Sequence, residues 1–199
     1  MKLFTILFVI ITALGASEEF DSVKRNYFKS YDYEQMGKYE EAIKVLSPLY
    51  NKYPKGYTLN LRFGWLFFID KKYKDAQKHY TKASLANPYA LDPRLGLIRV
   101  YLATASYKEA EQSAYKLLKI DYYNYYANIY ITQALIGERK FDIAHQIVLK
   151  MLALYPTDIA YLELLGLVYQ NTDSPYLEKL YEDILVLDPN NIFVNTNRK

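Results

Sequence analysis

The chain has 199 residues, 25 basic and 22 acidic side chains, a formal net charge of +3 and no cysteine. This length suits one domain or one continuous array, and a hydrophobic fraction of 51% is ample for a buried core. The lack of cysteine excludes disulfides and cysteine-ligated metals, and the near balance of charge gives no strong field for nucleic acid or an anionic membrane.

The first segment, residues 1–17, has the layout of a secretory signal peptide. Lys2 gives a positive start, residues 3–14 form an apolar run, and residues 15–17 are small, as a signal peptidase requires. The run is shorter than the roughly 20 residues that a membrane-spanning helix needs. We therefore expect cleavage, no integral membrane span in the mature chain, and export to the periplasm or medium of a bacterium. An uncleaved anchor is the alternative.

Residues 18–56 hold a polar lead-in and a first helical pair, with the pair itself over about residues 23–56. A helix ending near residue 36, a turn at Gly37 and a second helix over 39–52 are expected. Pro48 falls inside the second helix and is expected to kink it.

Residues 57–90 give the clearest helical pair. An apolar helix over 57–70 precedes an amphipathic helix that ends before Pro88, because proline cannot continue a helix. Gly64 lies in the first helix at a cost in helix propensity of roughly 1 kcal/mol. We expect it to allow close packing of the two helices, with the rings of Phe63, Phe67 and Tyr80 around it.

Three further pairs and a tail follow. The third pair is expected over residues 91–124, with helices over 91–104 and 107–120. The fourth is expected over 125–158, with helices over 125–137 and 141–154. The fifth is expected over 159–190, with helices over 159–172 and 175–187. The last pair is one residue short in its turn. In the tail, residues 191–199, we expect Ile192–Val194 to fold back over the last pair, because an uncovered apolar end lowers solubility; the alternative is that this end meets a partner.

A 34-residue period joins these pairs. Alanines stand at the same place in four successive pairs, and an aromatic residue precedes each by three positions: Ala42, Ala76, Ala110 and Ala144, with Tyr39, Tyr73, Tyr107 and Phe141. This helix–turn–helix pattern resembles the tetratricopeptide repeat family. The resemblance implies an all-α fold, a right-handed α-solenoid of about five such repeats over residues 18–199, following the signal peptide. It does not specify a function.

The segment Tyr122–Tyr126 contains four tyrosines. We expect the rings to wedge between the third and fourth pairs with their hydroxyls outward. The alternative is an exposed adhesive patch.

No catalytic or metal-binding pattern emerges. His79 and His145 lie on second helices without a carboxylate or histidine at metal-ligand spacing, and no glycine-rich phosphate loop is present. Both histidines are expected to be ordinary half-exposed helix residues. We therefore expect no enzyme activity, no cofactor and no bound metal.

The family resemblance implies a concave groove lined by the first helices. The corresponding positions here are Tyr27, Tyr31, Leu61, Trp65, Phe68, Ile69, Arg99, Leu102, Tyr126, Ile129 and Gln133. The helix over 57–70 is apolar on nearly every side, so it either is buried or holds a face for a partner. Aromatic residues and arginine dominate binding hot spots.

The sequence thus predicts a non-enzymatic scaffold or adaptor of the cell envelope that binds a peptide or helix of another protein in this groove. Two alternatives stay open: a self-associating structural module that forms a homo-oligomer, and a carrier of an apolar small molecule.

Overall fold

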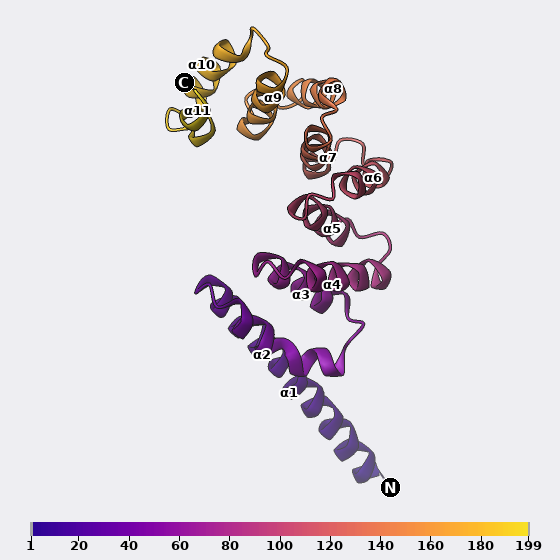
Figure 1. Cartoon of the computed structure of the whole chain (residues 1–199). Helices are drawn as coiled ribbons and strands as arrows, with labels where there is room; N and C mark the ends of the chain where they lie inside the picture. Colours follow the sequence, from indigo (N-terminus) through magenta and orange to yellow (C-terminus); the bar gives the residue numbers. More distant parts are fainter. Residues whose placement is uncertain (1, 199) are drawn as a thin grey trace. The chain divides into compact units, whose positions relative to one another are not determined.

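The computed structural model describes residues 2–198 and the side chains of residues 19–198, so the predicted signal peptide, residues 1–17, lies outside the described side chains. All regular secondary structure in residues 2–198 is helical (Figure 1). The helices are α1 (Lys2–Gln35), α2 (Tyr39–Lys52), α3 (Tyr57–Ile69), α4 (Tyr73–Ala86), α5 (Asp92–Ala103), α6 (Tyr107–Leu118), α7 (Tyr125–Gly137), α8 (Phe141–Leu152), α9 (Ile159–Asn171), α10 (Leu177–Leu187) and α11 (Ile192–Asn197).

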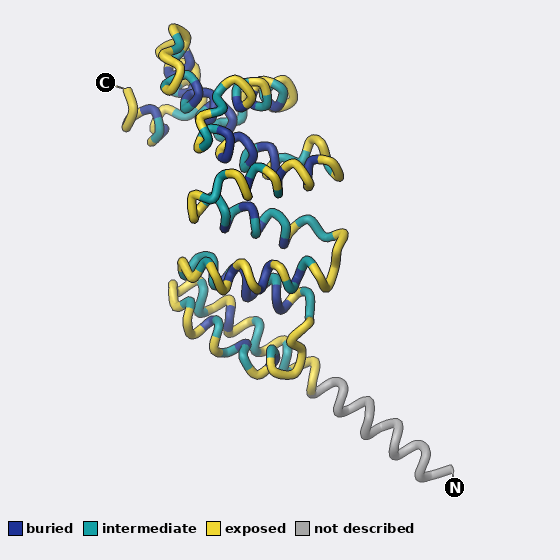
Figure 2. The backbone as a smooth tube through the Cα atoms, turned by 45° about the vertical axis from the view of Figure 1, so that its right-hand side comes forward, coloured by how far each residue is buried: buried dark blue, intermediate teal, exposed yellow. Residues whose placement is uncertain are grey.

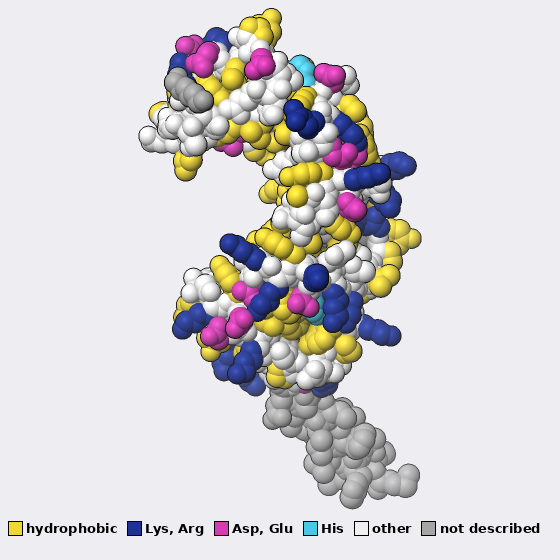
Figure 3. All heavy atoms as spheres, viewed as in Figure 1, with side chains coloured by type: hydrophobic (Ala, Val, Ile, Leu, Met, Phe, Trp, Pro, Cys, Tyr) yellow, Lys and Arg dark blue, Asp and Glu magenta, His cyan; other side chains and the backbone are white. Residues whose placement is uncertain are grey.

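The chain divides into two compact units, one over residues 1–89 with α1–α4 and one over residues 90–199 with α5–α11. Within each unit, consecutive helices contact one another, and in the second unit the first helices of successive pairs, α5, α7 and α9, also touch in sequence. Within residues 19–198, buried, half-buried and exposed residues alternate along the helices (Figure 2). In the face drawn in Figure 3, acidic and basic side chains are interspersed.

The turns inside the helical pairs repeat the 34-residue period in the backbone itself. One residue per turn has a positive φ: Gly37 (71°), Lys71 (58°), Ala105 (53°), Arg139 (60°) and Asp173 (49°). In the first of these turns, Lys38 N donates to Tyr33 O at 2.8 Å, which satisfies a helix-terminal carbonyl. Five pairs therefore end their first helices in the same way, although glycine occupies only one of these left-handed positions.

The predicted small-residue positions lie where helices pack against one another. Ala42, Ala76, Ala110 and Ala144 have no exposed surface. A Cβ on Gly64 would lie 2.6 Å from the ring of Tyr80, so this helix crossing requires glycine. This confirms the reason given for Gly64 from sequence.

The end of the chain covers the last pair, as expected. Val194 is fully buried, and the ring of Phe193 lies so close to Gly166 that a Cβ there would meet it at 2.7 Å. Ile192, the third apolar residue of the tail, is instead 81% exposed. The second helix of this pair begins at Leu177 rather than at Pro175, because Ser174–Tyr176 still belong to the turn.

The expectation that all the tyrosines of 122–126 are wedged inward is wrong for three of them. Tyr122, Tyr123 and Tyr126 are exposed, and Tyr125 alone packs inward, with its ring 5.3 Å from that of Tyr161. Tyr122 and Tyr123 precede α7. The Nζ atom of Lys150 lies 4.1 Å from the centre of the Tyr122 ring.

No helix within residues 19–198 has both the length and the apolar character needed to cross a bilayer.

Candidate functional site

A pocket of about 810 Å³ opens in the first unit between α1 and α3. It is called the α1–α3 pocket below. Eight side chains line it, four from each helix or its first turn: Tyr27, Tyr31, Glu34, Gln35, Thr58, Leu61, Arg62 and Trp65. Because α1 and α3 are the first helices of successive pairs, the pocket lies on the side of the unit where a groove was expected.

Four of the six groove residues predicted in this unit, Tyr27, Tyr31, Leu61 and Trp65, line the α1–α3 pocket. The other two predicted residues lie beside it. Phe68 stacks on Trp65 with ring centres 6.2 Å apart, and Ile69 packs on the core between α1, α2 and α3.

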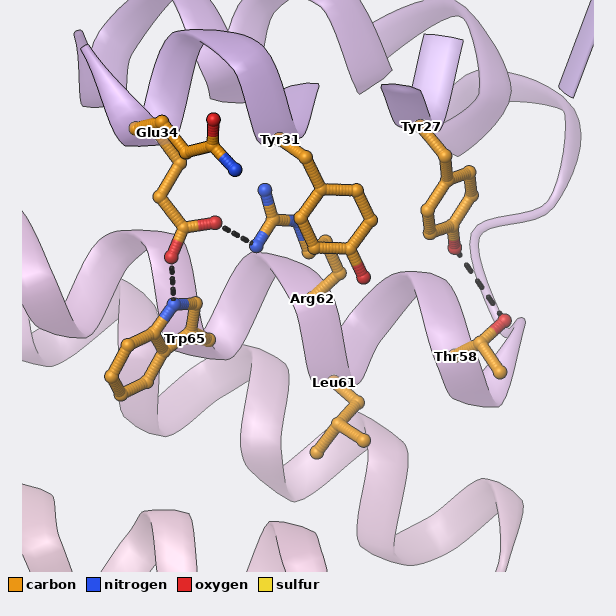
Figure 4. Close-up of a pocket in the computed structure, with 8 residues that line it drawn as sticks. Tyr27, Tyr31, Glu34, Thr58, Leu61, Arg62 and Trp65 are labelled. Atoms are coloured by element: carbon orange, nitrogen blue, oxygen red, sulfur yellow. Dashed lines mark hydrogen bonds and ion pairs between the residues drawn. The ribbon is translucent and has the colours of Figure 1, made fainter. Parts of the chain in front are cut away.

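An ion pair organises the pocket. Arg62, with 7% of its surface exposed, donates to Glu34 and also to Ser30 Oγ at 3.1 Å. The indole Nε1 of Trp65 donates to the second carboxylate oxygen of Glu34. Figure 4 shows Glu34 joined to both donors and the ring of Tyr31 over the Arg62 guanidinium, whose central carbon is 3.9 Å from the ring centre. The pair is therefore held by hydrogen bonds and a cation–π contact.

The phenol of Tyr27 marks the other end of the pocket. Its hydroxyl donates to Thr58 Oγ1 at 3.5 Å. Burial raises the pKa of Tyr27 above its usual value, so this hydroxyl stays protonated and acts as a donor at neutral pH.

Sequence reasoning missed the polar half of this site. Ser30 stands 34 residues before Gly64, is fully buried and serves as the small residue of its pair. The charge of Arg62 within an otherwise apolar helix was the available signal, since a charge on a buried helix needs a partner.

His79, on α4, was expected to be half exposed, and this expectation is wrong because the residue is buried. Its Nδ1 lies 2.9 Å from Oδ1 of Asn60, and its ring stacks on that of Phe63 with ring centres 5.0 Å apart. Asn60 in turn donates to the carbonyls of Pro54 and Gly56, at 3.0 and 2.8 Å. Burial is the largest cause that lowers the pKa of His79, to about 4, so the ring is neutral at pH 7.

The predicted groove residues of the second unit lie on α5 and α7. Tyr126 is exposed and stacks on Tyr130 with ring centres 6.3 Å apart, and Arg99 hydrogen-bonds with Tyr130. Gln133 is exposed as well. Leu102 and Ile129 are instead half buried against the core. The structure thus brings Arg99 close to the stacked tyrosine pair of α7 and turns two of the five predicted residues inward.

Within residues 19–198, no group of three or more histidine or carboxylate side chains could hold a metal ion.

Residues 67–113 match the family model described as tetratricopeptide repeat. No curated protein sequence matches the chain. Among solved structures, a MamA RS-1 double mutant has a TM-score of 0.74 and 18% identity, over 85% of this chain and 96% of its own. MamA from Desulfovibrio magneticus RS-1 has a TM-score of 0.71 and 17% identity, over 90% and 98%. YrrB, described as a TPR protein with an unusual peptide-binding site, has a TM-score of 0.69 and 14% identity, over 92% and 95%.

At these identities, the solved structures show a shared fold. The family match adds a sequence signal over one stretch of that fold, from the end of α3 into α6. Together they show that the chain has the tetratricopeptide-repeat fold, with the family's sequence signal over residues 67–113.

Proposed function

We propose that this protein is a non-enzymatic adaptor that binds an extended or helical segment of a partner protein in the α1–α3 pocket. The observation that carries the proposal is an open pocket of about 810 Å³, walled by aromatic rings, on the first helices of a repeat unit. Proteins with this fold typically mediate protein–protein interactions, and YrrB is described as having a peptide-binding site.

The chemistry of the pocket favours an apolar segment with a polar edge. Arg62 and Glu34 neutralise each other, so the pocket has no net charge to attract a strongly charged ligand. Trp65, Tyr27 and Tyr31 offer large rings whose positions are already restrained by contacts with neighbours. Restrained aromatic residues lose little conformational entropy when a partner binds, which is why they often dominate binding energy.

The remaining predicted residues extend this proposal in each unit. In the first unit, Phe68 and Ile69 would contact the part of the partner that runs past Trp65. In the second unit, we propose that Arg99, Tyr126 and Gln133 form a separate contact surface, with Leu102 and Ile129 supporting it from below.

Export to the bacterial envelope is part of the proposal and depends on the sequence of residues 1–17. The intact mass of the protein purified from its native cells tests this. We expect a chain that begins at residue 16, 17 or 18, whereas a full-length chain in the cytoplasmic fraction would overturn the export proposal.

A pair of matched variants tests the pocket. Leu61→Glu introduces a charge into the α1–α3 pocket, whereas Leu85→Glu introduces the same charge on α4, where the leucine is already 76% exposed. Each variant is tagged, expressed in native cells and purified with its bound proteins, after circular dichroism has shown that both are folded. We expect proteins bound by the parent to be lost from Leu61→Glu and kept by Leu85→Glu. Equal retention by both variants would overturn the proposal.

Self-association is a second candidate function, favoured by exposed aliphatic side chains at the end of the chain. Val186 is 80% exposed and Ile192 81% exposed, at the end of α10 and the start of α11. Light scattering over a range of concentrations tests this candidate. A mass that rises with concentration in the parent but not in Val186→Lys would support it, and a strict monomer would exclude it.

A further inference from the structure

A second pocket, of about 340 Å³, lies wholly within the second unit, where the start of α8 meets the end of α9 and the turn that leads into α10. It is called the α8–α10 pocket below, and the proposed partner-binding site does not involve it. Four aromatic side chains, Phe141, His145, Tyr169 and Tyr176, line it together with the carboxylate of Asp142.

These rings form a connected wall. The ring centres of His145 and Tyr169 are 5.7 Å apart with their planes tilted by 44°, and those of Tyr169 and Tyr176 are 6.3 Å apart with a tilt of 43°. Tyr176 is 66% exposed, so the wall is open to solvent on one side. Aromatic rings carry negative charge on their faces, and several rings around one space attract a cation.

The charged residues around the pocket also favour a positively charged ligand. Asp142 is its one carboxylate, and neither lysine nor arginine lines it. Lys140, just before α8, is held elsewhere, because its Nζ lies 2.8 Å from carboxylates of both Glu111 and Glu138.

Other aromatic groups of this chain are already covered by its own cations. Arg62 lies over Tyr31 at 3.9 Å, Lys82 over Tyr50 at 5.1 Å, and Lys150 over Tyr122 at 4.1 Å. No lysine or arginine of residues 19–198 occupies the equivalent place over the rings of the α8–α10 pocket. At the other rings a lysine or arginine of the chain itself makes the cation–π contact, whereas the rings of the α8–α10 pocket are open to a cation from outside.

We propose that the α8–α10 pocket binds an organic cation that carries N–H groups, that is, a primary ammonium or a guanidinium. The aromatic wall attracts the charge, and the exposed carboxylate of Asp142 pairs with it and accepts a hydrogen bond from the cation. Two sources share this chemistry: a free alkylammonium, and the lysine or arginine side chain of a protein.

The test titrates the full mature chain, labelled for NMR, with four compounds: n-butylammonium, tetramethylammonium, N-acetyl-lysine methylamide and neutral 1-butanol. We expect saturable shifts of the His145 ring and of residues around Tyr176 with the ammonium compounds. Binding should be tighter for n-butylammonium than for tetramethylammonium, which has no N–H to donate. Tighter binding of the lysine derivative than of n-butylammonium would assign the site to a protein side chain, and equal or weaker binding would assign it to a free cation.

Two variants with matched controls complete the test. Tyr176→Ala and Asp142→Asn should each weaken binding by about two- to five-fold, as expected for one open cation–π contact or one exposed charge. Tyr123→Ala removes a similarly exposed tyrosine and Glu109→Gln a similar acidic residue in the first turn of α6, and both should leave binding unchanged. Equal shifts with 1-butanol, no saturation, or unchanged affinity in both pocket variants would overturn the proposal.

Discussion

Glu34 is the residue on which the shape of the α1–α3 pocket depends most, because it accepts hydrogen bonds from both Arg62 and Trp65. The variant Glu34→Gln keeps the size of the side chain and removes its charge. Arg62, whose side chain is 6% exposed, is then left charged without a counter-ion. Removing one partner of a buried ion pair costs about 3–5 kcal/mol. Since the Glu34 side chain keeps 21% exposure, water replaces part of the lost interaction, and we expect the lower end of that range.

The assay is urea denaturation of the mature chain followed by the fluorescence of Trp65, the single tryptophan, which reports on the first unit directly. Arg62→Met, Glu34→Gln and the double variant form a double-mutant cycle. We expect the double variant to lose at least about 2 kcal/mol less than the sum of the single losses, because it no longer contains an unpaired buried charge.

Glu19→Gln is the matched control on the same helix. Glu19 pairs with Lys52 at 2.5 Å, but both side chains are well exposed, so its loss should have little effect on stability. The reasoning would be refuted by equal losses for Glu34→Gln and Glu19→Gln, or by single losses that add to within about 0.5 kcal/mol in the cycle.

Three further predictions concern stability and the end of the chain. The folded chain lowers the pKa of His79 from 6.5 to about 4, so the unfolded chain binds the additional proton first as the pH falls. The free energy of unfolding should therefore decrease between about pH 6.5 and pH 4, by about 3 kcal/mol in total, and His79→Gln should flatten this dependence in urea titrations at a series of pH values. Ala105→Gly should raise the free energy of unfolding by about 1 kcal/mol, because alanine is strained at φ 53°, whereas Ala103→Gly, at the last residue of α5, relieves no positive φ and should not raise it; equal effects would contradict this. Gly166→Ala should displace Phe193 and increase hydrogen exchange in α11 more than in α9, and unchanged exchange in α11 would show that the contact does not hold the tail.

The repeat architecture was predictable because its determinants are local and periodic. The boundaries of α2 matched the expected 39–52 range, and glycine at position 64 predicted a close approach that the ring of Tyr80 fulfils. The positions of successive turns follow from the same 34-residue period. The late start of α10, at Leu177 rather than at Pro175, was not predicted, because the shortened turn left the start of the helix ambiguous.

The site was less predictable because its polar contacts join residues far apart in the chain. Glu34 and Arg62 are 28 residues apart, and no helical spacing relates them. The burial of His79 depends in the same way on Asn60 of the neighbouring helix. At 122–126, composition gave the aromatic character but not the direction of each ring, since α7 begins at Tyr125 and only one side of that first turn faces the core.

The central claim is that the α1–α3 pocket binds a protein segment, and photo-crosslinking in native cells tests it most directly. A photoreactive phenylalanine replaces Tyr31, which lines the pocket and is 47% exposed, or Phe28, which lies on the same helix, is 57% exposed and lies outside the pocket lining. Both variants are first shown to be folded and present at the parent level. We predict a discrete protein adduct from position 31 and none from position 28. The same adducts from both positions, or no adduct from position 31, would contradict the account.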